Sequence, residues 1–235
     1  MVEVLHTTDR VLDHIGRYRI SLRKVLSHRY LNGSDTGNLI KKLIDERWIV
    51  ARDRASGKSL PGGLTYYQLT AKGAQKISCS VSRTKPMGAK LPRYLAMLWF
   101  CCMDSKRREL MSPDLLKRCI QNPPNPDSGH YAVQKTSKGS MFYRLFYLGK
   151  SKDAYALKKV TETFSQAVEH PDLSVILSQK LFRPTILVHQ PGRKKSLRTL
   201  FNQKLTGPQI QAVKIEVVPS IETLTRALHE FENKT

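Results

Sequence analysis

Apolar residues recur every three or four positions in the first part of the chain, and this spacing predicts helices. Three such segments each begin beside a residue that can cap a helix: 9–16 after Thr8, 22–31 after Ser21, and 34–46 at Ser34. In the third segment Leu39, Ile40, Leu43 and Ile44 cluster on one side. Apart from Thr36, the residues on the opposite side are Asn38, Lys41, Lys42 and Asp45. A helix with amide and ammonium groups on its outer side is suited to lie in a groove.

Two segments rich in β-branched and aromatic residues follow the third helix, at residues 48–54 and 64–70. The sequence "ASGKSLPGG" separates them, which predicts a hairpin with a long tip that carries Arg52, Arg54 and Lys58. The next phrase is "YYQLTAKGAQKI", in which Thr70 can cap a closing helix. Leu69 is expected to point into the core.

Three helices followed by a basic hairpin resemble the winged-helix variant of the helix-turn-helix, and the phrase "YYQLTAKG" is similar to the closure found in winged-helix regulators. The resemblance implies that helix 34–46 enters the major groove of DNA, with Thr36, Asn38, Lys41 and Lys42 on this helix. It further implies phosphate contacts from Arg52, Arg54 and Lys58 on the wing and from Arg23 or Arg29 on the second helix. Winged helices also bind proteins, and in that case Lys41 and Lys42 form only a solvated helix face.

Residues 78–92 have no periodicity and contain Gly, Pro and Ser, so we expect a linker there between a domain at 1–77 and a domain at 93–235. In the second domain the pattern predicts a mixed α+β or α/β layer fold. We expect helices at 93–103, 112–120, 153–170, 173–181, 195–203 and 221–232, and strands at 130–136, 141–149, 185–190 and 212–218.

A winged helix followed by this order of elements resembles the replication-relaxation family of plasmids and other bacterial mobile elements. The second domain of that family is similar to the restriction-endonuclease-like fold, and related mobilization relaxases share the arrangement. The resemblance implies a part in replication, in mobilization or in regulation of transcription. A homodimer and other proteins of a replication or mobilization complex are open as further partners, and the sequence does not decide whether the protein dimerises.

Charge supports a nucleic-acid partner, because the 235 residues include 40 Lys and Arg against 19 Asp and Glu, a net charge of +21. The middle stretch, 78–152, has fourteen cations against four anions and is the most basic third. We therefore expect the second domain to face phosphate as well. Arg193, Lys194 and Lys195 gather at the start of a predicted helix, where they oppose the helix dipole. Phosphate contact would explain them, and a solvated turn is the alternative.

Catalytic motifs are sparse. A restriction-endonuclease-like site needs an Asp and, on the next strand, an acid two positions before a Lys. Asp127 and Lys150 are the residues available, but Leu148 stands where the second acid is needed, so we expect a nuclease-like scaffold without a metal site or cofactor. A tyrosine nucleophile at Tyr143, Tyr147 or Tyr155 would make the protein a DNA-nicking enzyme instead.

The remaining features narrow the setting. The amino end has no apolar signal segment and no run is long enough to cross a bilayer, so we expect a cytoplasmic protein that contacts no membrane. Cys101 and Cys102 lie in an apolar run and are expected to be buried and reduced. The sequence thus predicts a protein that binds double-stranded DNA. A DNA-nicking enzyme and a scaffold for acidic protein partners are the alternatives.

Overall fold

The computed structural model describes residues 7–31, 36–52, 54–55, 58–59, 64–103, 108–124 and 130–232. The fold is mixed α+β and divides into two compact units. Unit 1 consists of Met1–Leu98 together with Pro219–Thr235, and unit 2 consists of Trp99–Val218. The chain thus passes from one unit to the other at Leu98 and again at Val218, whereas the expected domains were 1–77 and 93–235.

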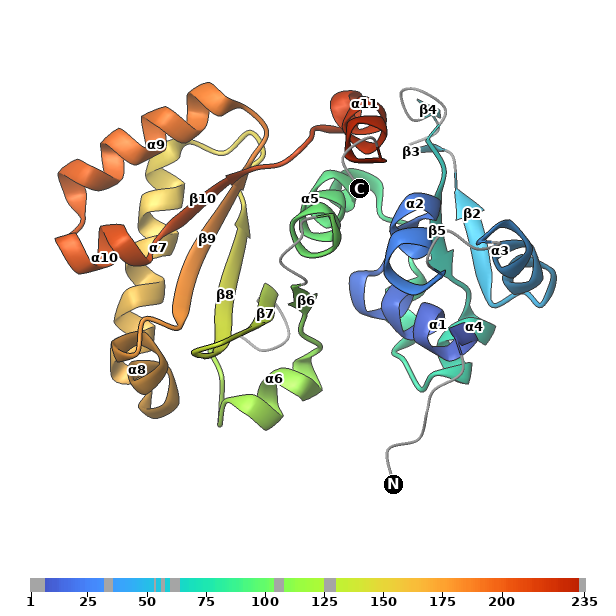
Figure 1. Cartoon of the computed structure of the whole chain (residues 1–235), viewed down its shortest axis with the longest axis horizontal. Coiled ribbons are helices and arrows are strands. Elements are labelled where there is room, and N and C mark those ends of the chain that lie inside the picture. The colour runs from blue at the N-terminus through green and yellow to red at the C-terminus, as the bar shows by residue number, and fades with distance from the viewer. Residues whose placement is uncertain are drawn as a thin grey trace. The chain divides into compact units, whose positions relative to one another are not determined.

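Unit 1 joins helices to a three-stranded antiparallel sheet with the order β1-β5-β2 (Figure 1). Its elements up to the end of the sheet region are α1 (Thr7–Tyr18), β1 (Ser21–Leu22), α2 (Arg23–Leu26), a π-helical turn (Ser27–Leu31), α3 (Thr36–Asp45), β2 (Ile49–Arg52), β3 (Arg54–Ala55), β4 (Lys58–Ser59), β5 (Tyr66–Leu69) and α4 (Ala71–Lys76). The core between helices and sheet includes Val11, Leu12, Leu43 and Leu69. The expected inward position of Leu69 is confirmed, since this side chain is 1% exposed.

Ser21 does not cap a helix, contrary to the expectation. It lies on β1, pairs with Tyr67 of β5 and is fully buried. Its hydroxyl is 3.0 Å from Nε2 of His14. The residue at the cap position of α2 is Leu22, whose side chain makes no cap hydrogen bond. A short buried strand therefore occupies the place where the sequence predicts the start of the second helix.

The residues of "YYQLTAKG" hold the start of α4 against the segment that follows α3. Thr70 caps α4 as expected, because its hydroxyl accepts the Gly73 N–H at 3.1 Å, and the Thr70 N–H donates to the Trp48 carbonyl at 3.0 Å. Lys72 Nζ donates to the Glu46 carbonyl at 3.0 Å. A Cβ atom at Gly73 would lie 1.9 Å from the Trp48 oxygen, so only glycine fits there. The phrase thus helps to fix where α3 ends.

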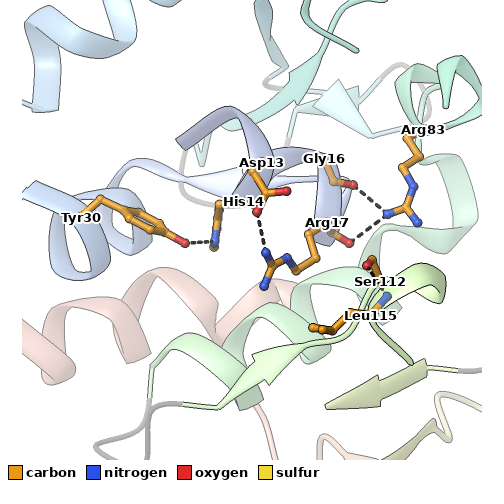
Figure 2. A network of polar contacts seen from close by, with 8 residues as sticks. All are labelled: Asp13, His14, Gly16, Arg17, Tyr30, Arg83, Ser112 and Leu115. Atoms are coloured by element: carbon orange, nitrogen blue, oxygen red, sulfur yellow. Dashed lines mark hydrogen bonds and ion pairs between the residues drawn. The ribbon is translucent and has the colours of Figure 1, made fainter. Parts of the chain in front are cut away.

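The stretch expected to be a linker is folded against α1. Residues Val81–Thr84 and Gly88–Lys90 form 3₁₀ turns. Figure 2 shows the Arg83 guanidinium, which donates from Nη1 to the carbonyls of Gly16 at 2.9 Å and Arg17 at 3.3 Å. The last carbonyls of a helix have no partner within it, so this arginine serves as a cap for α1. Residues 78–92 are therefore a part of unit 1.

The helix α11 (Ile221–Glu232) also belongs to unit 1, although the sequence places it in the second domain. Leu224 and Leu228 on this helix are each 2% exposed. The ring of Phe231 meets that of His28 edge-on, with centroids 5.0 Å apart. The chain thus leaves unit 1, forms unit 2 and returns.

Unit 2 is built on a five-stranded mixed sheet with the order β10-β9-β8-β7-β6. Strands β8, β9 and β10 are parallel, whereas β6 and β7 run antiparallel to their neighbours. The elements are α5 (Leu91–Cys102, which begins in unit 1), β6 (Glu109–Leu110), α6 (Pro113–Cys119), β7 (His130–Thr136), β8 (Gly139–Tyr147), α7 (Asp153–Glu169), α8 (Pro171–Ser178), β9 (Phe182–Val188), α9 (Pro191–Lys204), α10 (Gly207–Ala212) and β10 (Lys214–Val217).

Helices α7 and α9 cover one face of this sheet (Figure 1). Phe164 of α7 and Phe201 of α9 pack in one core with Ile186 of β9 and with Leu148, which directly follows β8. Leu148 is 3% exposed, so the core itself accounts for an apolar residue at this position.

Two smaller expectations for this region are confirmed. Ser112 caps α6, as the Leu115 N–H donates to its hydroxyl at 3.2 Å (Figure 2). Cys101 and Cys102 are buried, and neither forms a disulfide. Among the helices that the structure describes, none combines the length and apolarity that crossing a bilayer requires.

Candidate nucleic-acid interface

Helix α3 presents a polar side to solvent. Ile40 and Leu43 are buried, with exposed fractions of 6% and 0%. Asn38, Lys41 and Lys42 are exposed on the other sides of the helix, as the sequence pattern indicates. Thr36 differs, because it is only 6% exposed at the first position of the helix. The core thus turns the predicted amide and ammonium groups of α3 outward and keeps Thr36 inside.

Beside α3 the surface carries an open hollow of about 200 Å³. Arg23 from α2, Lys41 from α3 and Tyr67 from β5 line it together with Gly37, Ile40 and Ile44. Ile44, which the periodicity places in the core, is 37% exposed. Arg23 is exposed as well. Burial raises the pKa of Tyr67, and the charge of Arg23 offsets a part of this increase. The hollow brings a predicted phosphate contact and a predicted groove residue together.

The other predicted cations of unit 1 are less accessible. Arg29 is half-buried and lies near enough to His14 to affect its protonation. Arg52 is half-buried opposite Tyr66 on β5, and its Nε atom is buried. Arg54 and Lys58 lie on the paired strands β3 and β4, but their side chains are outside the described residues.

His14 is a buried polar residue that the sequence pattern does not reveal. Its Nε2 is 3.0 Å from the Ser21 hydroxyl and its Nδ1 is 3.0 Å from the Tyr30 hydroxyl, a contact drawn in Figure 2. Burial lowers its pKa to about 3, and the charges of Arg29 and Arg17 act in the same direction. His14 is therefore neutral at physiological pH and joins α1, β1 and the π-helical turn.

In unit 2, exposed lysines lie on the segments that follow β8 and β9. Parallel strands end at the same edge of a sheet, where ligands of α/β sheets commonly bind. Here Lys150 and Lys152 follow β8, and Lys194 and Lys195 lie in the first turns of α9, which follows β9. We call these four exposed residues the lysine edge.

Arg193 does not share the exposure of Lys194 and Lys195. Its Nε donates to Asp153 Oδ1 at 3.0 Å, its Nη1 donates to the Gly149 carbonyl at 2.5 Å, and its Nη2 donates to the Ser151 carbonyl. These bonds tie α9 to the loop that carries Lys150. They also give Arg193 an internal reason for its place near a helix start, so an external phosphate is not needed to explain it.

Of the three tyrosines considered as nucleophiles, Tyr147 has a histidine partner. Its hydroxyl is 2.8 Å from Nε2 of His189, and Nδ1 of His189 is 3.1 Å from the Val218 carbonyl. A carbonyl can only accept, so Nδ1 carries the proton and Nε2 accepts from the tyrosine. Tyr143 instead donates to Gln134 at 2.6 Å, and Tyr155 is 47% exposed.

Of the two residues predicted for a metal site, the structure places only Lys150. Asp127 lies outside the described residues, and Lys150 is exposed in the turn after β8. Asp153, three positions after Lys150, is engaged by Arg193 and by the Ser196 hydroxyl, the latter at 2.6 Å. Within the part of the chain that the structure describes, no three His, Cys, Asp or Glu residues are grouped to hold a metal ion.

Two arginines of unit 2 are buried, so they add little to the surface charge. Arg108 is 1% exposed and its guanidinium carbon lies 4.1 Å from the Phe100 ring centroid. Arg144 is 9% exposed and lies 4.3 Å from the centroid of Tyr131. Burial lowers the pKa of Arg144 in spite of Tyr131. These cation–π contacts join positions 8 and 13 residues apart, beyond the reach of a helical or strand period.

Comparison of the chain with protein-family models, with curated proteins and with solved structures finds no match. The function must therefore be inferred from the side chains themselves.

Proposed function

We propose that this protein binds double-stranded DNA in a sequence-specific manner, with α3 lying in the major groove. The observation that carries the proposal is the outer side of α3, where Asn38, Lys41 and Lys42 are exposed next to Arg23. A major groove about 12 Å wide admits an α-helix, and amide and ammonium groups are typical donors to base edges. Arg23 would then contact phosphate.

The arrangement of unit 1 supports a winged-helix interpretation. Three helical segments precede strand β2, which is an antiparallel neighbour of β5, and the β3–β4 pair lies between these two strands in sequence. In this proposal the β3–β4 pair belongs to the wing, so Arg54 and Lys58 would lie near phosphates together with Arg52. Such contacts hold the protein on the duplex without selecting a sequence.

Unit 2 would add phosphate contacts through the lysine edge. The excess of cations is shared, with 20 Lys and Arg against 10 Asp and Glu in unit 1 and 20 against 9 in unit 2. We propose a restriction-endonuclease-like scaffold that holds duplex without cutting it. A cytoplasmic protein of a mobile element, acting in replication, mobilization or regulation of transcription, as a homodimer or with other proteins, fits this chemistry.

Selection of bound duplexes from a random library tests the proposal. A recovered motif would establish sequence preference, and its symmetry would report the oligomeric state. Binding should weaken steeply with salt, since each neutralised phosphate releases counterions. A protein-binding scaffold would give no motif and no salt-dependent duplex binding.

The Tyr147–His189 pair favours DNA nicking as a second candidate. The Tyr147 oxygen would attack a phosphodiester phosphorus, its proton would pass to His189 Nε2, and the nucleotide oxygen that leaves would take that proton. The tyrosine would then be joined to the phosphate. Supercoiled plasmid incubated with the protein and magnesium or manganese should show nicks and a covalent adduct that are lost in Tyr147→Phe and retained in Tyr155→Phe. Intact plasmid in all samples would leave DNA binding as the function.

A further inference from the structure

Unit 2 contains an open cavity of about 510 Å³ that is separate from the lysine edge. Helices α7, α8 and α10 and the start of β9 surround it. Its apolar lining includes Phe164 and Val168 of α7, Leu177 of α8 and Ala212 of α10. Its volume lies within the range of roughly 300 to 1,000 Å³ that is usual for pockets that hold small molecules.

Part of this lining is apolar surface in contact with water. Phe164 is 3% exposed, whereas Val168 is 65% exposed at the margin. A large exposed aliphatic side chain beside a hollow gains free energy when a ligand covers it. An occupant would therefore need an apolar body.

Two cations line the same cavity. Lys180 follows α8 and is exposed, and Arg183 on β9 is half-buried. Among the described residues, neither side chain has a carboxylate partner, and the cavity lining contains no Asp or Glu. An anionic group on the occupant would give both cations a partner.

Side-chain amides complete the lining. Gln209 and Gln211 of α10 both border the cavity. The Gln209 Oε1 already accepts the Thr206 N–H at 3.1 Å, which holds this side chain in place at the start of α10. Its amide N–H groups can donate to an oxygen of an occupant.

We propose that this cavity binds a small organic acid, with an apolar body against Phe164, Leu177 and Ala212 and an anionic group near Lys180 and Arg183. The apolar walls distinguish this ligand from a DNA phosphate, which has no apolar body to fill them. The proposal does not depend on DNA binding, because none of the cavity residues belongs to the interface described above.

The test uses the full chain and the fluorescent probe 1-anilinonaphthalene-8-sulfonate, an aromatic body with one sulfonate. We expect saturable binding at one site per chain and displacement by octanoate but not by octanol. Lys180→Glu and Arg183→Glu should each weaken binding roughly tenfold or more, since a charge-assisted bond is lost and a repulsion added. Lys204→Glu, at an exposed cation of α9 that does not line the cavity, makes the same change of charge and should leave binding unaltered.

A blocking variant keeps the test independent of charge. Gln211→Trp places a large ring in the cavity from an exposed position and should abolish probe binding without lowering the melting temperature. Equal probe binding by Gln211→Trp and the parent would overturn the proposal. Displacement by octanol as effectively as by octanoate, or displacement by a short DNA duplex, would also overturn it.

Discussion

His14 links pH to the stability of unit 1. Its folded-state pKa of about 3 lies below its ordinary value of 6.5, so the unfolded chain binds the proton more tightly. No stability is lost above pH 6.5, and stability falls as pH decreases from 6.5 toward 3. At one proton per chain the loss between pH 7 and pH 5 is about 2 kcal/mol.

We predict that His14→Gln lowers stability at pH 7 but loses less on acidification to pH 5. Glutamine retains hydrogen-bonding groups for Ser21 and Tyr30 and cannot take up a proton. Urea unfolding in a Trp99→Phe background, where Trp48 remains to report on unit 1, measures this, because the chain has two tryptophans. If the free energy of unfolding changes equally with pH in the variant and its parent, His14 is protonated in the folded state.

Gly73 offers a stability test at a single backbone contact. We predict that Gly73→Ala lowers the free energy of unfolding by roughly 2 to 4 kcal/mol, since the added Cβ would meet the Trp48 carbonyl and force α4 away. Gly192→Ala in α9 is the matched control, because nothing lies within 4 Å of the added atom. That variant should be neutral or slightly stabilising. Equal effects of the two substitutions would contradict the close packing of α4.

Arg193 and Lys194 are neighbours with different surroundings. We predict that Arg193→Ala lowers stability by about 1 to 2 kcal/mol, as it removes one of the two donors to Asp153 and the donor to two loop carbonyls. Lys194→Ala should leave thermal unfolding unchanged and weaken binding to every duplex alike, because its charge is exposed. Chemical denaturation and duplex titration of both variants separate the two roles. Reversed effects would mean that Lys194 supports the loop and Arg193 faces the ligand.

At the scale of elements, α3 determines the sequence preference that we propose. Asn38→Ala or Lys41→Ala should lower the preference for the selected sequence by roughly 1 to 3 kcal/mol, the usual contribution of a base contact. Arg54→Ala or Lys58→Ala should weaken binding to all duplexes and flatten its salt dependence. Titrations of the selected and a scrambled duplex at several salt concentrations measure both. If the α3 variants lose affinity for the two duplexes equally, α3 does not read bases.

The local pattern predicts elements well where one period dominates. The strand His130–Thr136 and the helix Ile221–Glu232 appear at the expected residues, because alternation and a three-to-four spacing are local properties. The same pattern fails for α10, whose six residues are too few to show a helical period. It also fails at β1, where two residues complete a sheet edge and the decisive partner, Tyr67, is far along the chain.

The candidate site was predictable only in part for the same reason. Exposure of Asn38, Lys41 and Lys42 follows from the helical period, and the structure has them exposed. The surroundings of Arg193 depend on Asp153, forty positions earlier, which the sequence does not link to it. Ile44 fits the apolar stripe of α3 but lies at its margin, where tertiary packing decides whether a side chain is covered.

At the scale of the whole molecule, α11 stabilises unit 1, although all of unit 2 lies between this helix and the rest of unit 1 in the sequence. We predict that a stop codon before Ile221 lowers the stability of unit 1, since Leu224 and Leu228 are buried on this helix. Each buried leucine contributes about 1.5 to 3 kcal/mol. Unfolding followed by Trp48 in the Trp99→Phe background measures the effect. Leu224→Ala with Leu228→Ala in the full chain should reproduce part of it, whereas a stop before Asn233 should not.

The boundaries of the units could not be read from local composition. Glycine, proline and serine in residues 78–92 suggest a linker, yet Arg83 binds α1 and Gln68 donates to the Lys85 carbonyl at 3.2 Å. A helical period likewise gives the ends of α11 without saying which unit it joins. Membership in a compact unit depends on contacts between distant residues, and these are absent from any local window.

The return of the chain to unit 1 has a consequence for synthesis on the ribosome. Domains generally fold as units during translation, at about 5 to 20 residues per second. All of Trp99–Val218 is made before Ile221. Unit 2 can therefore fold while the surface of unit 1 against which α11 packs is still uncovered. During that interval the nascent chain exposes apolar side chains that α11 later covers. A nascent-chain binder such as a chaperone would therefore find its target in the DNA-binding part that we propose, and would be released when α11 emerges.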